Sequence, residues 1–105
     1  MTAFSAEYIE SFRLSLRKHI QEWSKEYFFT DEKITTFVQS IYKAIELTKI
    51  VPEMHEETSA IYNFNSPTYR ILIGKNYAIF YRIDRSTKKI MLGNMYYQRQ
   101  LHVLF

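Results

Sequence analysis

The chain is short of the residues that cross-link or interrupt a fold: among 105 residues it has no cysteine, two glycines and two prolines. The absence of cysteine excludes disulfides and thiolate metal ligands, and an intracellular setting fits this composition. Scarce glycine and proline, with 47% hydrophobic and 17% aromatic residues, argue against a disordered protein. We expect one well-packed domain, residues 1–105.

Long apolar runs and a strong charge of one sign are missing as well. No segment approaches the roughly 20 apolar residues of a membrane span, and MTAFSAEYIESF at the N-terminus does not resemble a secretory signal. We therefore expect a cytoplasmic protein with no membrane partner. The formal net charge of +3 permits a nucleic-acid partner without requiring one. Neither His19 nor His55 has a second histidine at metal-ligand spacing, so no metal and no cofactor are expected.

Three short apolar runs between residues 69 and 97 stand out in what the chain does contain. They begin at Tyr69, Tyr77 and Lys89, and polar turn residues at 74–76 and 84–88 separate them. Aromatic and β-branched residues are typical of strands, whereas Gly, Asn, Asp and Ser tolerate the backbone angles of tight turns. The pattern predicts a meander of three antiparallel strands.

The length of the first turn decides which side chains share a face of this meander. A three-residue loop at 74–76 pairs Ile73 with Tyr77 and gathers the isoleucines on one apolar face. A two-residue loop would scatter them over both faces, so we favour the first register. The face away from the core then carries two arginines among apolar side chains: Arg70, Leu72, Ala78, Phe80 and Arg82.

Two amphipathic helices are predicted before the meander. The first runs from about residue 6 to about residue 25, with Ser5 as its N-cap and a very short strand closing at Phe4 before it. The second follows an N-cap at Thr30–Asp31 and ends before Pro52. The apolar stripe of the first helix recurs at spacings of three and four: Ile9, Phe12, Leu16, Ile20, Trp23 and Tyr27.

These helices form an antiparallel hairpin over about 6–50 that needs a partner for its apolar stripes. The meander supplies one, which predicts an α+β fold with the N-terminal helical hairpin packed on a small twisted antiparallel sheet. Residues 53–66 are predicted to form a polar surface loop in which residues 61–64 contact the core. Residues 98–105 are expected to form a C-terminal tail or a helical turn.

The order of these features resembles the RelE/ParE toxin superfamily over about residues 4–105. The resemblance is carried by two helices, an acidic Pro-Glu-Met segment at 52–54, Tyr-Arg-Ile-Leu-Ile-Gly at 69–74, a Tyr-x-Ile-x-Tyr-Arg strand at 77–82 and a basic tail. It implies the toxin of a type II toxin–antitoxin module, with a cognate antitoxin that binds and neutralises it in a hetero-oligomer.

Two targets are known for this superfamily, and the resemblance leaves both open. RelE-like members enter the ribosome and cleave mRNA without a metal, whereas ParE-like members inhibit DNA gyrase and have no nuclease activity. Ribosome-dependent mRNA cleavage is our first expectation. The alternatives are gyrase inhibition and a degenerate toxin that only binds its antitoxin.

Matching the superfamily's motifs gives Arg70, Tyr97 and Arg99 as candidate catalytic residues. Arg70 lies on the strand before the central one and Arg99 in the basic segment after the last, both positions where RelE-like nucleases keep a basic residue. Tyr97 occupies a position where many relatives have histidine or another polar group. Ala78 and Leu72 stand where these nucleases have further basic residues, which favours the non-nuclease alternatives.

Cleavage of RNA by its own 2′-OH requires a proton acceptor, cations for the phosphorane charge and a proton donor for the leaving oxygen. Arginine suits the second task because its guanidinium matches phosphate bidentately. Arg82 and His102 are therefore candidate RNA- or target-binding residues. Alternatively, Arg82 is an ordinary solvated residue beside a turn. His102 would then belong to a tail whose role is only to cover the apolar layer.

Overall fold

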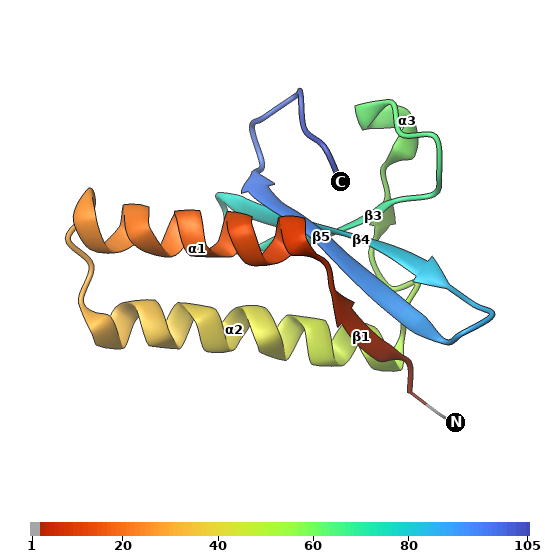
Figure 1. The fold of residues 1–105 in the computed structure, drawn as a ribbon, viewed down its shortest axis with the longest axis horizontal. Coiled ribbons are helices and arrows are strands. Elements are labelled where there is room, and N and C mark those ends of the chain that lie inside the picture. Colours follow the sequence, from red (N-terminus) through yellow and green to blue (C-terminus); the bar gives the residue numbers. More distant parts are fainter. Residues whose placement is uncertain (1–2) are drawn as a thin grey trace.

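The computed structural model describes residues 3–105, in which two long helices pack on one face of a five-stranded sheet (Figure 1). The long helices are α1 (Glu10–Lys25) and α2 (Asp31–Ile50), and a short helix, α3 (Ser59–Tyr62), lies on the other side of the sheet. The strand order is β1-β5-β4-β3-β2. The strands are β1 (Ser5–Tyr8), β2 (Glu56–Glu57), β3 (Tyr69–Ile73), β4 (Tyr77–Asp84) and β5 (Lys89–Tyr97).

The predicted α+β class and the helical hairpin on a meander are confirmed, and so is the register of the first turn. Ile73 pairs with Tyr77 and Ile71 with Ile79, which places the isoleucines beneath the helices. One edge differs from the prediction, because β1 runs parallel to β5 and makes the sheet mixed. No helix in residues 3–105 is long and apolar enough to cross a membrane.

The start of the first helix was predicted wrongly. Residues 5–8 form the edge strand β1, and α1 begins at Glu10 with Ile9, not Ser5, at its N-cap. Pairing with β5, which is 84 positions away at Ser5 and Lys89, outweighs the local capping preference of a serine. The predicted strand closing at Phe4 lies partly in residues 1–2, outside the described residues.

The second helix starts where the sequence indicates. The Thr30 hydroxyl accepts a hydrogen bond from the backbone N–H of Lys33 at 3.1 Å, and Asp31 adds a carboxylate to the first turn. The helix ends at Ile50, two residues before Pro52. Antiparallel packing of α1 and α2 brings both apolar stripes against the sheet (Figure 1).

The segment expected to be a surface loop contains two short elements instead. Glu56 and Glu57 pair with Arg70 and Tyr69 as the edge strand β2, and α3 follows at once. The carboxylate of Glu57 accepts hydrogen bonds from the backbone N–H of Ser59 and of Thr68, which holds the two ends of the segment together. A carboxylate that closes a loop in this way cannot be recognised from composition alone.

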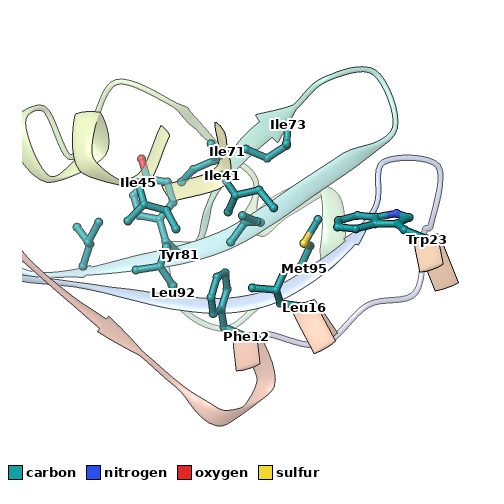
Figure 2. Packing of buried hydrophobic residues seen from close by; sticks show 12 residues of the cluster. Phe12, Leu16, Trp23, Ile41, Ile45, Ile71, Ile73, Tyr81, Leu92 and Met95 are labelled. Atoms are coloured by element: carbon teal, nitrogen blue, oxygen red, sulfur yellow. The ribbon is translucent and has the colours of Figure 1, made fainter. Parts of the chain in front are cut away.

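The main core lies between the hairpin and the sheet (Figure 2). Phe12, Leu16 and Trp23 extend from α1 toward the side chains of β4 and β5, and Ile41 and Ile45 of α2 fill the space beside them. All five are nearly or fully buried. Burial of apolar surface at about 25 cal/mol per Å² makes this layer the principal source of stability.

A second apolar cluster covers the opposite face of the sheet. Its buried members are Ala78 and Phe80 of β4 and Tyr96 of β5, at most 1% exposed. The rings of Phe80 and Tyr96 stack at 4.2 Å between centroids. Side chains from α3, the loop after it and the C-terminal tail complete the cover: Tyr62, Phe64, Val103 and Phe105. The face predicted to carry arginines is therefore a second, smaller core.

A β-bulge in β5 decides which way the end of that strand faces. Tyr81 pairs with Leu92 and Ile79 with Met95, so Gly93 and Asn94 together oppose the single residue between them on β4. The extra residue reverses the alternation of side chains beyond it. The backbone N–H of Asn94, which the bulge leaves free, donates to the carbonyl of Phe105 at 2.6 Å.

Candidate functional site

The sheet divides the five predicted site residues between two places. Arg70 on β3 and Arg82 on β4 extend from the face covered by α3 and the tail, where His102 also lies. Tyr97 extends from the end of β5 toward α1, and Arg99 lies beside it with its guanidinium 5.5 Å from the centre of the Tyr97 ring. The structure therefore brings Tyr97 and Arg99 together but separates both from Arg70.

Arg70 is held by groups of its own chain. Nη1 donates to the Tyr62 hydroxyl at 2.9 Å, and Nη2 donates to Oε1 of Glu56 at 2.7 Å. Nε is buried and has no partner among the described residues. The Arg70 side chain is 21% exposed and that of Glu56 58%. A phosphate that reached this guanidinium from solvent would therefore have to displace or bypass the Glu56 carboxylate.

Arg82 is packed rather than solvated. Its Nε donates to the Thr68 hydroxyl at 3.0 Å, and the guanidinium lies over two rings, 4.0 Å from the centre of Phe105 and 5.6 Å from that of Phe64. Burial lowers its pKa, although arginine stays charged at any physiological pH. Arg82 thereby links the tail to the second core and lines a small surface hollow of about 450 Å³.

His102 lies in the tail, which is irregular rather than helical. Its side chain lines a hollow of about 430 Å³ between α3 and the tail, together with Tyr62 and Phe64. The tail begins with an anchoring residue, since the Gln98 amide donates to the carbonyls of Gly74 and Tyr77 at 3.2 and 2.8 Å. The tail covers the second core, as its apolar residues suggested, and still presents His102 to solvent.

Tyr97 is bound to a carboxylate. Its hydroxyl donates a short hydrogen bond to Oε2 of Glu22 on α1. Burial and the neighbouring Glu22 raise the pKa of Tyr97 far above the usual value for a phenol. The phenol therefore stays protonated and cannot act as a base, and while its proton is held by Glu22 it is a weaker proton donor than a free phenol.

The largest concave feature beside Tyr97 and Arg99 lies where the α1–α2 connection, the β3–β4 turn and the end of β5 meet. We name it the hairpin-tip groove; its volume is about 690 Å³. Three cations and five aromatic residues line it, together with Asn76 and Gln98: Lys33, Lys75, Arg99, Tyr27, Phe29, Phe37, Tyr77 and Tyr97. A neighbouring hollow of about 530 Å³ shares Tyr77 and continues along α2 to Trp23.

Sequence reasoning missed Lys33 and Lys75 as members of a site. Each is an ordinary surface lysine in its own segment, one on α2 and one in the β3–β4 turn. The available signal was the aromatic run at 27–29, since three successive rings in a helix–helix connection have no helical partner face. Only the tertiary fold brings the two lysines to these rings.

A buried histidine, His19, and a half-buried one, His55, also escaped prediction as parts of the fold. His19 lies among the rings of Tyr77 and Tyr97, with Nε2 3.2 Å from the carbonyl of Met95, and burial lowers its pKa. His55 is 3.1 Å from the Thr48 hydroxyl, and burial lowers its pKa as well. Residues 3–105 contain no cluster of potential ligands that could hold a metal ion.

Among solved structures, the chain is similar to a chain of the RelBE2 toxin–antitoxin complex from Mycobacterium tuberculosis. The TM-score is 0.60 and the alignment covers 92% of this chain and 100% of the other, at 13% sequence identity. The likeness establishes the fold, so the architecture expected from the sequence resemblance is confirmed. No family model matches the sequence, and the curated proteins contain no match to it.

Proposed function

We propose that this chain is the growth-inhibiting toxin of a type II toxin–antitoxin module. The observation that carries the proposal is the likeness, over nearly the whole length of both chains, to a chain from a toxin–antitoxin complex. The motifs at 69–74 and 77–82 support the same class. The partner is then a cognate antitoxin, which forms a hetero-oligomer with the toxin, and the compartment is the cytoplasm that holds both candidate targets.

As its action we propose ribosome-dependent cleavage of mRNA, without a metal or other cofactor. Arginines suit the phosphorane charge, and Arg70, Arg99 and Arg82 are the candidates. Tyr97 is a candidate donor to the leaving oxygen rather than a base, provided that its hydroxyl is first released from Glu22. His102, presented from the tail, is a candidate contact to RNA.

A second candidate action is inhibition of DNA gyrase by binding. The observation in its favour is that Arg70 and Tyr97 extend from opposite faces of the sheet, so one phosphate cannot contact both in this arrangement. A binding protein needs contact residues rather than one reaction centre. A degenerate toxin that only binds its antitoxin is the third alternative.

Growth of a bacterial host tests membership of the toxin class. We expect induced expression to stop growth, and co-expression of the protein encoded by the neighbouring gene to restore it. The two proteins should co-purify as one complex. Unchanged growth upon induction, at a protein level confirmed by immunoblot, would contradict the proposal.

The target is decided by a cell-free translation reaction with the purified protein. New mRNA 5′ ends, mapped by primer extension within ribosome-occupied codons and absent without ribosomes, would support cleavage. Intact mRNA with normal protein synthesis would refute it. A supercoiling assay with purified gyrase would then separate the gyrase inhibitor from the degenerate toxin.

The Arg70→Ala substitution tests the site assignment in the same reaction. Loss of a group that stabilises transition-state charge should lower cleavage by about 10²- to 10³-fold while antitoxin binding persists. Arg85→Ala is the matched control, since Arg85 pairs with Glu53 at 2.8 Å on the surface, with both side chains 60% exposed. Equal cleavage by wild type and by Arg70→Ala, with circular dichroism spectra that agree, would remove Arg70 from the site.

A further inference from the structure

We propose that the hairpin-tip groove binds single-stranded RNA, with phosphates at Lys33 and Lys75 and nucleobases stacked on the aromatic rings of the α1–α2 connection. The groove contains neither Arg70 nor His102. Tyr97 and Arg99, two of the candidate catalytic residues, do line it, so the inference rests on the proposed function and adds where that site would hold RNA. Its test does not require the ribosome or an antitoxin.

The charge of the groove is of one sign. Lys33 comes from α2, Lys75 from the β3–β4 turn and Arg99 from the segment after β5, so three separate elements bring cations to one hollow. No carboxylate lines it, and Glu22 beneath Tyr97 is occupied by the tyrosine hydroxyl. Glu32 lines the neighbouring hollow. A chain of phosphates fits such a surface because it meets several cations in succession.

The aromatic residues at the tip are exposed to an unusual degree. Tyr27, which lines the groove, is 50% exposed, and Phe28, which follows it in the α1–α2 connection but does not line the groove, is 83% exposed. Phe28 also has φ = 55°, in the left-handed region that bulky side chains avoid. A strained backbone that holds an aromatic ring in solvent is a feature that clusters at ligand-binding segments.

The rings and cations together favour RNA over an acidic polypeptide. Lys33 Nζ lies 3.9 Å from the centre of the Phe29 ring, and Arg99 lies over Tyr97 in the same way, so charge and ring are side by side. Single-stranded nucleic acids offer flat bases and phosphates at the same short intervals, and base–aromatic stacking tolerates any sequence. A peptide anchor would instead require a deep pocket for one side chain, whereas the most exposed ring, Phe28, stands out from the surface.

Fluorescence anisotropy with a fluorescein-labelled 12-nucleotide oligouridylate tests the proposal across a series of salt concentrations. We expect the double variant Lys33→Gln/Lys75→Gln to bind at least fivefold more weakly. Each phosphate contact to a single strand contributes about 0.7 to the slope of log affinity against log salt, so two lost contacts should lower it by about 1.4. Tyr27→Ala, which removes an exposed ring that lines the groove, should lower affinity at least fivefold and leave the slope unchanged, because stacking releases no counterions.

The matched control is Arg17→Gln/Lys43→Gln, two exposed cations on α1 and α2 that do not line the groove. Both double variants have a formal net charge of +1, two below the +3 of the wild type. The proposal is overturned if the two double variants bind equally well, if Tyr27→Ala binds like the wild type, or if the wild type does not bind the oligouridylate. A different outcome would assign the groove to an acidic polypeptide: the wild type fails to bind RNA but binds a labelled Glu/Leu peptide, and Lys33→Gln/Lys75→Gln loses that peptide binding.

Discussion

At the scale of single residues, the end of the tail packs over a glycine, Gly93, and leaves no room there for a side chain. A Cβ at Gly93 would lie 2.5 Å from the carbonyl oxygen of Phe105 and 2.8 Å from its ring. That carbonyl also accepts from the Asn94 N–H at 2.6 Å and from the Ser11 hydroxyl at 2.9 Å. Gly93 therefore permits both the bulge and the docking of the tail onto it.

We expect Gly93→Ala to destabilise the protein by about 1–3 kcal/mol, the usual cost of overpacking, because backbone as well as ring must move aside. Urea unfolding followed by circular dichroism measures the change. In a Phe105→Ala background, Gly93→Ala should lower the free energy of unfolding by less, because a tail without the Phe105 ring is held less firmly and can move aside. Strictly additive effects would show that the tail does not dock on Gly93.

At the scale of elements, the sequence predicted what local patterns determine. The Gly74 turn set the register of β3 and β4, and Thr30 marked the start of α2. It did not predict the β1–β5 pairing, which depends on residues far apart in the chain. Nor did it predict the bulge, which separates two of the candidate site residues: with unbroken alternation Tyr97 would share a face with Arg70, and the shift at 93–94 places it on the other. An isolated glycine within a strand was the one local sign of that bulge.

The N-cap of α2 gives an element-scale prediction. Thr30→Ala removes the acceptor for the Lys33 N–H and should lower the free energy of unfolding by about 1 kcal/mol, measured by thermal or urea unfolding. Thr30→Ser keeps the acceptor and is the control. Because Lys33 follows the cap, a frayed first turn should also weaken RNA binding at the groove, whereas Thr30→Ser should retain it.

At the scale of the whole molecule, buried titratable rings set the pH range of stability. Burial raises the pKa of Tyr81, Tyr96 and Tyr97, so each binds its proton more tightly in the folded than in the unfolded chain. That contribution is present below the unfolded pKa of about 10 and is lost as pH rises above it. Burial lowers the pKa of His19 and His55, so their contribution is lost as pH falls below about 6.5.

We therefore expect a plateau of stability between roughly pH 7 and pH 9.5, with losses on both sides. Urea unfolding at intervals from pH 5 to pH 11 would trace it. Tyr97→Phe, which has no proton to lose, should make the alkaline decline shallower by up to about 1.4 kcal/mol per pH unit. A decline as steep as that of the wild type would mean that Tyr97 titrates freely.

The position of Trp23 makes the boundary between hairpin and sheet observable. It is the only tryptophan in the chain, its indole N–H donates to the Tyr77 hydroxyl of β4 at 2.7 Å, and its ring meets Phe37 of α2 edge-on at 4.8 Å. Three elements thus converge on one fluorophore. Its emission should shift to longer wavelength when the hairpin lifts from the sheet and stay constant when the tail alone detaches. The protein carries an intrinsic probe that distinguishes loss of its main core from loss of its second one.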